Sequence, residues 1–242
     1  MRVPVATYRL QFNRAFRFSD ARALVPYLHT LGISDLYASP LLQARPGSLH
    51  CYDGTDPSRL NPELGTDQEF DALVGELKTH GMGLLVDLVP NHMAASPENP
   101  WWVDVLEDGP ASPYASYFDI DWHPLESGLD NRIPLPLLGD PYAQALENQE
   151  LTVALEEGGF FIRYYEREFP LNLTAYRDML TFRLDRLRQG LGANHPGLHE
   201  LGKLISTIET VSRHSAHDPE TAPKRHRAKE DIKDELWALY HA

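Results

Sequence analysis

Three polar side chains stand at the end of one short apolar run. The run Leu84–Val89 carries a single acid, Asp87, and is followed by Pro90, Asn91 and His92. A carboxylate in an apolar strand is costly to bury unless it is paired, so Asp87 should meet an arginine, a backbone donor or a ligand. The end of a buried parallel strand is where α/β folds place their chemistry. The motif indicates a substrate site. Taken alone, it gives about equal weight to a purely structural role, in which Asp87 caps a neighbouring element and His92 packs in a loop.

A second set of candidates lies in the connection Ser39–Gly65. The sequence predicts no regular secondary structure there, and structureless connections of such length are more often functional. Its polar and aromatic candidates are His50, Tyr52, Asp53, Asp56 and Asn61. A flat ring beside carboxylates suits a sugar, because the ring packs on the apolar face of a pyranose while the acceptors bind its hydroxyls. The alternative is an ordered surface loop.

The elements that would position these residues alternate between strands and helices. The expected strands are Val5–Phe12, Ile33–Ala38 and Leu84–Val89. One intervening helix is expected to begin with Ser19 as its cap and to end at Gly32. The other is expected to begin with a capping box of Thr66 and Glu69 and to end at Gly81. This alternation predicts parallel, right-handed β-α-β units.

The second half of the chain has a different pattern. Residues 96–139 are rich in Pro, Trp, Tyr and Asp, and Leu151–Leu155 with Phe160–Tyr165 predict a β-hairpin. Helical spacing predicts one helix over Tyr176–Leu191 and further helices over 197–213 and 227–240. Ser215–Lys224 is expected to be a polar connection, and the basic run Lys224–Lys229 a helix start or solvated linker.

The composition limits the partner and the compartment. A formal net charge of −13 disfavours nucleic acid and anionic membranes, which both attract basic faces. No apolar run approaches the roughly 20 residues of a membrane span. The single cysteine, Cys51, excludes an internal disulfide, so a reducing cytoplasm is the simplest compartment. No glycine-rich nucleotide loop follows a strand and the histidines are scattered, so neither a cofactor nor a metal is expected.

The candidate motifs resemble those of a known enzyme family. Asp87…Asn91-His92 resembles the first signature region of the α-amylase superfamily of glycoside hydrolases, and Tyr52…Asp56…Asn61 resembles its strand-two loop. Within the superfamily, the likeness is strongest to the maltooligosyltrehalose synthase branch. The segments that carry it are Ala6–Phe12, Ser39–Ser48, Asp56–Gly65, Phe118–Trp122, Leu135–Gly139 and Arg163–Leu171. They cover essentially the whole chain, with its last segment weakest.

The resemblance implies a fold and a reaction. The fold would be α/β: residues 1–95 would form the N-terminal part of a (β/α)8 TIM barrel, with about three barrel strands. Residues 96–242 would form a mostly helical inserted domain with a β-hairpin. The reaction would be intramolecular transglucosylation, in which the reducing-end α-1,4 bond of a maltooligosaccharide becomes an α,α-1,1 bond. Enzymes of this kind use two carboxylates roughly 5 Å apart.

The resemblance also assigns roles to single residues. Tyr52 would stack under the reacting sugar, and His92 would bind its hydroxyls. Asp87 would support the catalytic floor through an arginine partner, Asn91 would order the loop, and Asp53 would be a weaker substrate contact. The family usually has glycine where this chain has Cys51.

The bond-breaking carboxylates of the family are not recognised in these residues. The family nucleophile lies in an Arg-x-Asp motif after strand four, whereas Arg183-Leu-Asp185 stands in a helical pattern that predicts a solvated face. We therefore expect the N-terminal part of a longer enzyme, inactive alone, whose uncovered sheet edge would meet the rest of the barrel. Two alternatives remain: a non-catalytic α-glucan-binding or interaction protein, and another enzyme of the superfamily. The aromatic residues of 101–122 could be sugar platforms, but core packing is favoured about two to one.

Overall fold

The computed structural model describes residues 3–89, 92–125, 128–157, 159–192, 194–213 and 222–242. It divides into two compact units, Met1–Asn99 (unit 1) and Pro100–Ala242 (unit 2). The boundary expected at residue 95 and the inserted character of the second part stay predictions. Asn91 and residues 215–221 of the expected polar connection lie outside the described residues.

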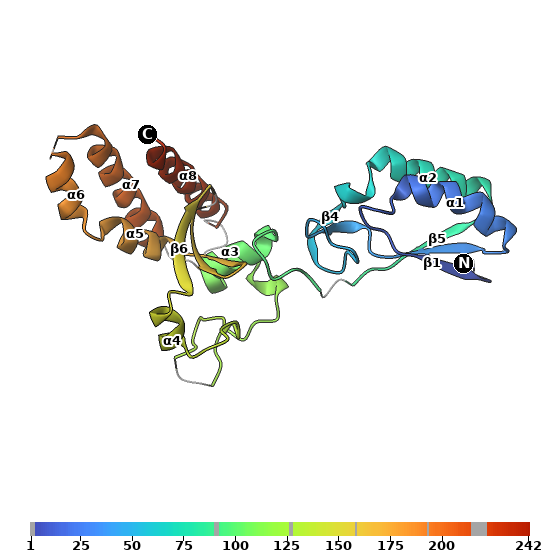
Figure 1. Cartoon of the computed structure of the whole chain (residues 1–242), viewed down its shortest axis with the longest axis horizontal. Coiled ribbons are helices and arrows are strands. Elements are labelled where there is room, and N and C mark those ends of the chain that lie inside the picture. Colours follow the sequence, from blue (N-terminus) through green and yellow to red (C-terminus); the bar gives the residue numbers. More distant parts are fainter. Residues whose placement is uncertain (1–2, 90–91, 126–127, 158, 193, 214–221) are drawn as a thin grey trace. The chain divides into compact units, whose positions relative to one another are not determined.

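Unit 1 is built around a parallel sheet of strand order β1-β2-β5. Its elements are β1 (Thr7–Leu10), α1 (Phe18–Thr30), β2 (Asp35–Ala38), β3 (Leu42–Ala44), β4 (Gly54–Leu60), the 3-10 helix η1 (Pro62–Leu64), α2 (Asp67–Thr79) and β5 (Gly83–Val86). Helices α1 and α2 lie side by side on one face of the sheet (Figure 1). The expected succession of parallel β-α-β units is confirmed.

The helix-facing side of the sheet forms the core of unit 1. Leu10 and Leu36 on the strands, Leu28 on α1 and Leu73 on α2 are buried together, and this burial of apolar surface is what holds the helices on the sheet. The start of α2 has the expected capping box. Thr66 Oγ1 accepts from the backbone N–H of Glu69 at 3.2 Å, and the Glu69 carboxylate accepts from the backbone N–H of Thr66 at 2.7 Å.

Three local expectations for unit 1 were wrong. The third strand is not buried: Leu85 is 39% and Val86 49% exposed, because β5 is an edge strand and helices cover only one face of the sheet. The connection Ser39–Gly65 is not structureless, since it contains the antiparallel pair β3 and β4 and the helix η1. Ser19 does not cap α1, which begins at Phe18 after Arg17, whose backbone N–H donates to Asp20 at 2.8 Å.

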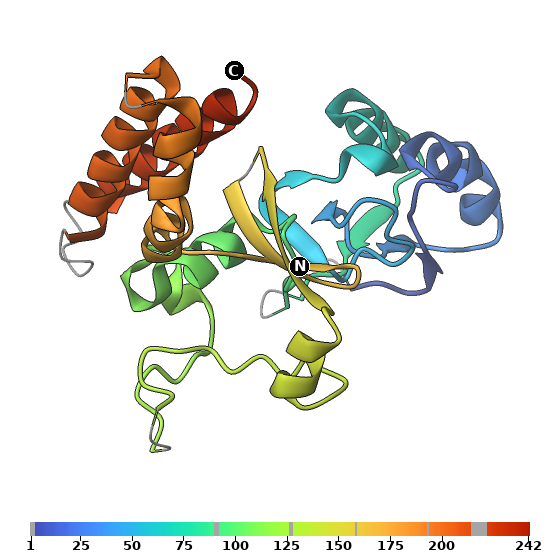
Figure 2. The same cartoon turned by 60° about the vertical axis from the view of Figure 1, so that its left-hand side comes forward.

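Unit 2 combines a small sheet with helices. It begins with α3 (Pro100–Asp108), the 3-10 helices η2 (Gly109–Ala111) and η3 (Ala115–Tyr117), and α4 (Tyr142–Glu147). The antiparallel strands β6 (Leu151–Glu156), β7 (Gly159–Tyr164) and β8 (Arg167–Pro170) precede α5 (Leu173–Thr181), α6 (Leu184–Leu191), α7 (Pro196–Arg213) and α8 (Ala222–Tyr240). Helix α7 packs against both α5 and α8 (Figure 2). The expected hairpin is β6–β7; the third strand, β8, was not foreseen.

The single helix expected over Tyr176–Leu191 is in fact two helices. Helix α5 ends before Phe182, and Arg183 adopts a left-handed φ of 56° before α6 begins. Apolar spacing cannot reveal such a break, because one left-handed residue changes the chain direction without changing the periodicity. The side chain of Asp185 on α6 is 89% exposed and pairs with Arg188, in agreement with the solvated helix face expected for Arg183-Leu-Asp185.

A buried cluster of charges joins α3 to α8 within unit 2. The Lys229 side chain is 2% exposed, and its Nζ lies 3.0 Å from Asp104, 2.7 Å from Glu107 and 2.9 Å from Asp108. Burial alone would lower the pKa of Lys229, but these three carboxylates outweigh it and raise the pKa. The solvated linker considered for Lys224–Lys229 is therefore wrong: the run lies in α8 and ends on a buried lysine.

Candidate functional site

The candidate site begins on the sheet face that the helices leave uncovered. In the parallel register Arg9 pairs with Tyr37, and Tyr37 pairs with Leu85. Residues paired in register point to the same face, and Asp87 stands two residues beyond Leu85. Arg9, Tyr37 and Asp87 therefore gather on the face away from α1 and α2, at the carboxyl ends of the strands. Arg9 lies on β1, Tyr37 on β2 and Asp87 directly after β5, so the sheet itself positions them.

Asp87 accepts hydrogen bonds from two tyrosines. The Tyr37 hydroxyl donates to Asp87 Oδ2 at 3.0 Å, and the Tyr52 hydroxyl donates to the same oxygen. Arg9 Nη2 lies 3.8 Å from this oxygen, and the Asp87 side chain is 14% exposed. The sequence left an arginine, a backbone donor or a ligand open as partners of Asp87; the structure gives it Arg9 on β1 and the hydroxyls of Tyr37 and Tyr52.

These donors hold Asp87 in its charged form. The Tyr52 hydrogen bond has the largest effect, and with Tyr37 and Arg9 it outweighs burial, so the pKa of Asp87 lies below its ordinary value. The same contact raises the pKa of the Tyr52 hydroxyl, since ionised Tyr52 would face the Asp87 charge. Asp87 is thus a stable carboxylate acceptor, unsuited to giving up a proton near neutral pH.

A tight turn presents Tyr52 to Asp87. Cys51 is buried in the left-handed region at φ 58°, and its Sγ accepts from the Asn61 side-chain amide at 3.6 Å. Asp53 is engaged inside the turn, accepting from the Ser48 hydroxyl at 2.5 Å. The left-handed backbone gives a physical reason for a glycine at position 51, because glycine adopts positive φ at little cost.

The remaining predicted residues fall around this turn. The His50 ring lies nearly parallel to Tyr52, with 6.1 Å between the ring centroids. His92 is exposed, and its segment returns to β4, where the Ala94 N–H donates to Gly54 O at 2.8 Å. His92 is not among the described side-chain partners of Asp87, which are Tyr37, Tyr52 and Arg9. The substrate contacts of Tyr52, Asp53 and His92 stay predictions, as does the role of Asn91.

Two other polar residues of the connection have internal roles. Asp56 accepts from Ser58 and pairs with Arg59, and both neighbours are on the same strand. Asn61 is buried and caps η1 by accepting from the Glu63 N–H at 3.0 Å. Neither side chain reaches Asp87 in the described contacts, so the site narrows to the turn 48–53 and the strand ends.

Sequence reasoning missed Arg9, Gln11 and Tyr37. Arg9 Nη2 donates to the Tyr52 hydroxyl at 3.2 Å and Arg9 Nη1 donates to Gln11 Oε1 at 2.9 Å, while the Arg9 guanidinium lies 5.5 Å from the Tyr37 ring centroid. A signal was present: Arg9 and Gln11 alternate along one strand face, as polar residues facing a site would. Recognising their partner required the register between strands.

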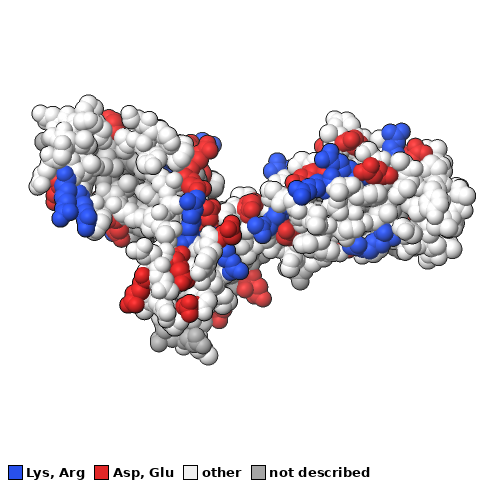
Figure 3. All heavy atoms as spheres, in the orientation of Figure 1, with Lys and Arg blue, Asp and Glu red and all other residues white. Residues whose placement is uncertain are grey.

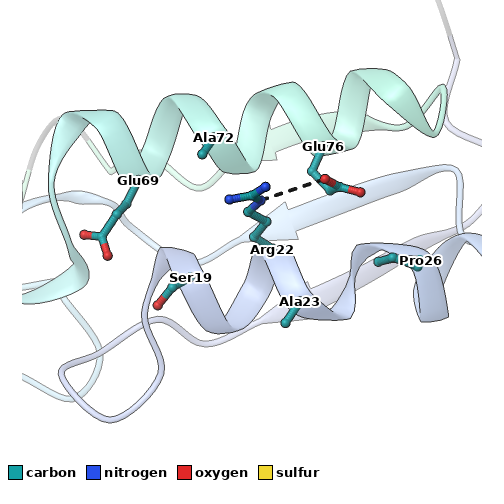
Figure 4. Close-up of a pocket in the computed structure, with 7 residues that line it drawn as sticks. All are labelled: Ser19, Arg22, Ala23, Pro26, Glu69, Ala72 and Glu76. Carbon is teal, nitrogen blue, oxygen red and sulfur yellow. Dashed lines mark ion pairs between the residues drawn. The ribbon is translucent and has the colours of Figure 1, made fainter.

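A groove on the other side of unit 1 lies between α1 and α2 (Figure 4). It has a volume of about 480 Å³, and Arg22 crosses it to Glu76 with 3.8 Å between Nε and Oε2. The groove belongs to the helix layer and shares no lining residue with the Asp87 network. Across the face of unit 1 drawn in Figure 3, acidic and basic side chains are interspersed.

The aromatic residues of unit 2 pack on one another. Trp101 stacks on Tyr114 with 5.4 Å between ring centroids, and both meet Tyr117 edge to face. Tyr117 is 63% exposed and Trp101 and Tyr114 are partly buried, so the choice between core packing and a sugar platform stays open. Among the described residues, no group of three His, Cys, Asp or Glu side chains is placed to hold a metal ion, and no described helix is long and apolar enough to cross a membrane.

Comparison with known proteins places these features in a family. Residues 23–164 match the family model of the alpha amylase catalytic domain. A putative maltooligosyl trehalose synthase of Mycobacterium tuberculosis is 49% identical over 142 residues, which are 56% of this chain and 18% of that protein. The intracellular maltogenic amylase of Bacillus subtilis is 28% identical over 188 residues, covering 76% of this chain and 30% of the amylase.

Solved structures agree with this placement. Maltooligosyltrehalose synthase from Arthrobacter ramosus matches with a TM-score of 0.60 and 43% identity, over 69% of this chain and 21% of that one. A hypothetical maltooligosyl trehalose synthase of Sulfolobus tokodaii matches with a TM-score of 0.60 and 34% identity, over 78% and 24%. The chain thus spans less than a quarter of each of these two structures. The fold expected from the sequence, the N-terminal part of a (β/α)8 barrel, is confirmed, and the chain belongs to the α-amylase family.

Proposed function

We propose that the chain supplies the sugar-holding part of the active site of a maltooligosyltrehalose synthase. The observation that carries the proposal is the convergence of Tyr52 and Asp87 at the carboxyl edge of the sheet. The substrate would be a maltooligosaccharide, whose reducing-end α-1,4 bond becomes α,α-1,1 without net hydrolysis. The family match and the synthase relatives support this choice of reaction.

Each residue would act through binding. The Tyr52 ring would pack against the apolar face of the reacting glucosyl unit, and exposed His92 would hydrogen-bond its hydroxyls. Asp87, held ionised by Tyr52, Tyr37 and Arg9, would fix the position of the Tyr52 ring through the hydrogen bond to its hydroxyl. Asn91 would order the segment before His92. The two carboxylates that break and form the glycosidic bond would be supplied by further polypeptide.

Exposed apolar side chains along the edge strand β5 support a macromolecular partner for unit 1. Leu85, Val86, Leu88 and Val89 all expose apolar surface on or just beyond β5, and an exposed edge strand is a template for pairing. We propose that further strands of the barrel cover this surface. A reducing cytoplasm is the proposed compartment.

A second candidate is a non-catalytic α-glucan-binding protein. The observation that favours it is Asp185, which stands on a solvated helix of unit 2 and lacks the strand context of a nucleophile. In both candidates Tyr52 and Asp87 hold a sugar, so the two differ in whether a reaction follows. A third candidate, another enzyme of the family, would hydrolyse the bond.

Two experiments separate these candidates. Titration of the chain with maltopentaose should give saturable binding, and cellopentaose, which has β-linkages, should bind much more weakly; equal binding of the two sugars would reject the α-glucan site. A chimera of the Mycobacterium tuberculosis relative, with its matching segment replaced by that of this chain, then tests the reaction. Loss of reducing ends supports the synthase, a gain of reducing ends indicates hydrolysis, and binding with no reaction favours the non-catalytic candidate.

A further inference from the structure

Arg9 on β1 and Gln11, which follows that strand, contact the turn that carries Tyr52 at separate points. Arg9 Nη2 donates to the Tyr52 hydroxyl at 3.2 Å. Gln11 Nε2 donates to the backbone carbonyl oxygens of Leu49 at 3.3 Å and His50 at 3.4 Å. One residue therefore holds the tip of the side chain, and the other holds the backbone just before it.

The two contacts are coupled through a third hydrogen bond. Arg9 Nη1 donates to Gln11 Oε1 at 2.9 Å. A glutamine amide has one acceptor oxygen and one donor nitrogen. Because Arg9 occupies the oxygen, the amide nitrogen is turned toward the carbonyl groups of Leu49 and His50. The planar guanidinium thus fixes the orientation of both the Tyr52 hydroxyl and the Gln11 amide. A lysine, with a single ammonium point charge, could not do this.

The hydroxyl of Tyr52 gains a fixed direction from this arrangement. It accepts from Arg9 and donates to Asp87, so its hydrogen points to the carboxylate. Arg9 is held in turn by the Tyr37 ring, 5.5 Å from its guanidinium carbon. Tyr52 follows a left-handed residue on a connection and is only half-buried. A side chain in that position keeps one orientation only if neighbours hold it.

We propose that Arg9 and Gln11 form a clamp that positions the Tyr52 ring for the sugar. Both are positioning residues, since they act through Tyr52 and its turn. The proposal rests on the proposed function for the identity of the sugar, whereas the clamp itself is a property of unit 1. It extends the site from the strand-three motif to the first strand.

Two substitutions separate the contacts. Arg9→Lys keeps the positive charge and loses the planar fork. Gln11→Glu keeps an acceptor for Arg9 and loses the donors to Leu49 and His50. The matched control is Arg22→Lys on α1, where the arginine pairs with Glu76 across the outer groove (Figure 4).

Hydrogen exchange of the full chain tests the clamp without any activity. Both variants should speed amide exchange in a peptide spanning residues 48–53 by about tenfold, with a peptide spanning 34–38 unchanged and Arg22→Lys like the native chain. Maltopentaose binding should weaken about tenfold in Arg9→Lys, although the charge is retained. Unchanged exchange over 48–53 would overturn the clamp, as would an equal increase over 34–38. If the native chain binds no maltopentaose, the proposed function fails while the exchange result still decides the clamp.

Discussion

The Tyr52 hydroxyl donates a hydrogen bond to the Asp87 carboxylate across 35 residues of sequence. Tyr52 lies on the turn between β3 and β4, and Asp87 follows β5. The contact therefore exists only when the sheet and the β3–β4 pair are both folded. It joins the two motifs that the sequence offered separately, and it makes one site from them.

Two replacements of Tyr52 should distinguish the contribution of its ring to sugar binding from that of its hydroxyl. Tyr52→Phe keeps the ring and loses the bond to Asp87, so maltopentaose affinity should fall about fivefold, which corresponds to about 1 kcal/mol. Tyr52→Ala removes the stacking surface as well and should cost about thirtyfold or more. Isothermal titration measures both. Tyr27→Phe, at an exposed position on α1, is the control. Equal losses for Tyr52→Phe and Tyr52→Ala would contradict the stacking role.

The charge of Asp87 should determine the acid limit of maltopentaose binding, which is the pH below which affinity falls. Its pKa is below the ordinary value of about 3.9 because Tyr52, Tyr37 and Arg9 favour the carboxylate. Affinity for maltopentaose should therefore be flat near neutral pH and fall only in strong acid, as Asp87 takes up a proton. Arg9→Gln removes a positive charge, so the pKa of Asp87 should rise and the acid limit should move to higher pH. Carbon-detected NMR of the carboxylates would follow the change, and a shift to lower pH would contradict it.

The buried lysine of unit 2 should dominate its stability. Lys229→Met leaves Asp104, Glu107 and Asp108 buried without their shared cation, and breaking a buried pair costs about 3–5 kcal/mol of unfolding free energy. Lys203→Met, at a pair exposed on α7, should cost less than about 0.5 kcal/mol. Tryptophan fluorescence reports on unit 2 alone, because all four tryptophans, Trp101, Trp102, Trp122 and Trp237, lie there. Similar losses of unfolding free energy in both variants would show that the buried cluster contributes no more to stability than an exposed ion pair.

Two glycines of unit 2 should respond in opposite directions to alanine. Gly159 has φ 107°, and a Cβ there would collide with the hydroxyl of buried Tyr176, which accepts from the Phe160 N–H at 2.9 Å. Gly159→Ala should destabilise unit 2 by at least about 2 kcal/mol through strain and the displaced tyrosine. A Cβ at Gly202, inside α7, meets no atom within 4 Å. Gly202→Ala should add about 0.5–1 kcal/mol, because alanine favours the helix. Denaturant unfolding followed by tryptophan fluorescence measures both, and a loss at both positions would contradict the difference.

Local chemistry was readable from the sequence alone. The alternation of strands and helices over the first 86 residues follows from apolar periodicity and from the Thr66–Glu69 capping box, which are interactions between near neighbours. The need of Asp87 for a partner follows from the cost of burying a lone carboxylate, wherever that partner lies. The family resemblance rests on the same motifs, and the comparisons confirmed it.

Only the tertiary structure decided which distant residues meet. The cation beside Asp87 is Arg9, because the register of β1, β2 and β5 places their side chains on one face. Lys229 is buried because α8 packs against the acidic residues of α3. Its neighbours in the sequence are basic and had allowed a solvated linker. Sequence patterns record each residue's preference for water, whereas partners are chosen by register and packing between segments far apart in the chain. The sequence thus determined that Asp87 needs a partner, and the fold selected Tyr37, Tyr52 and Arg9.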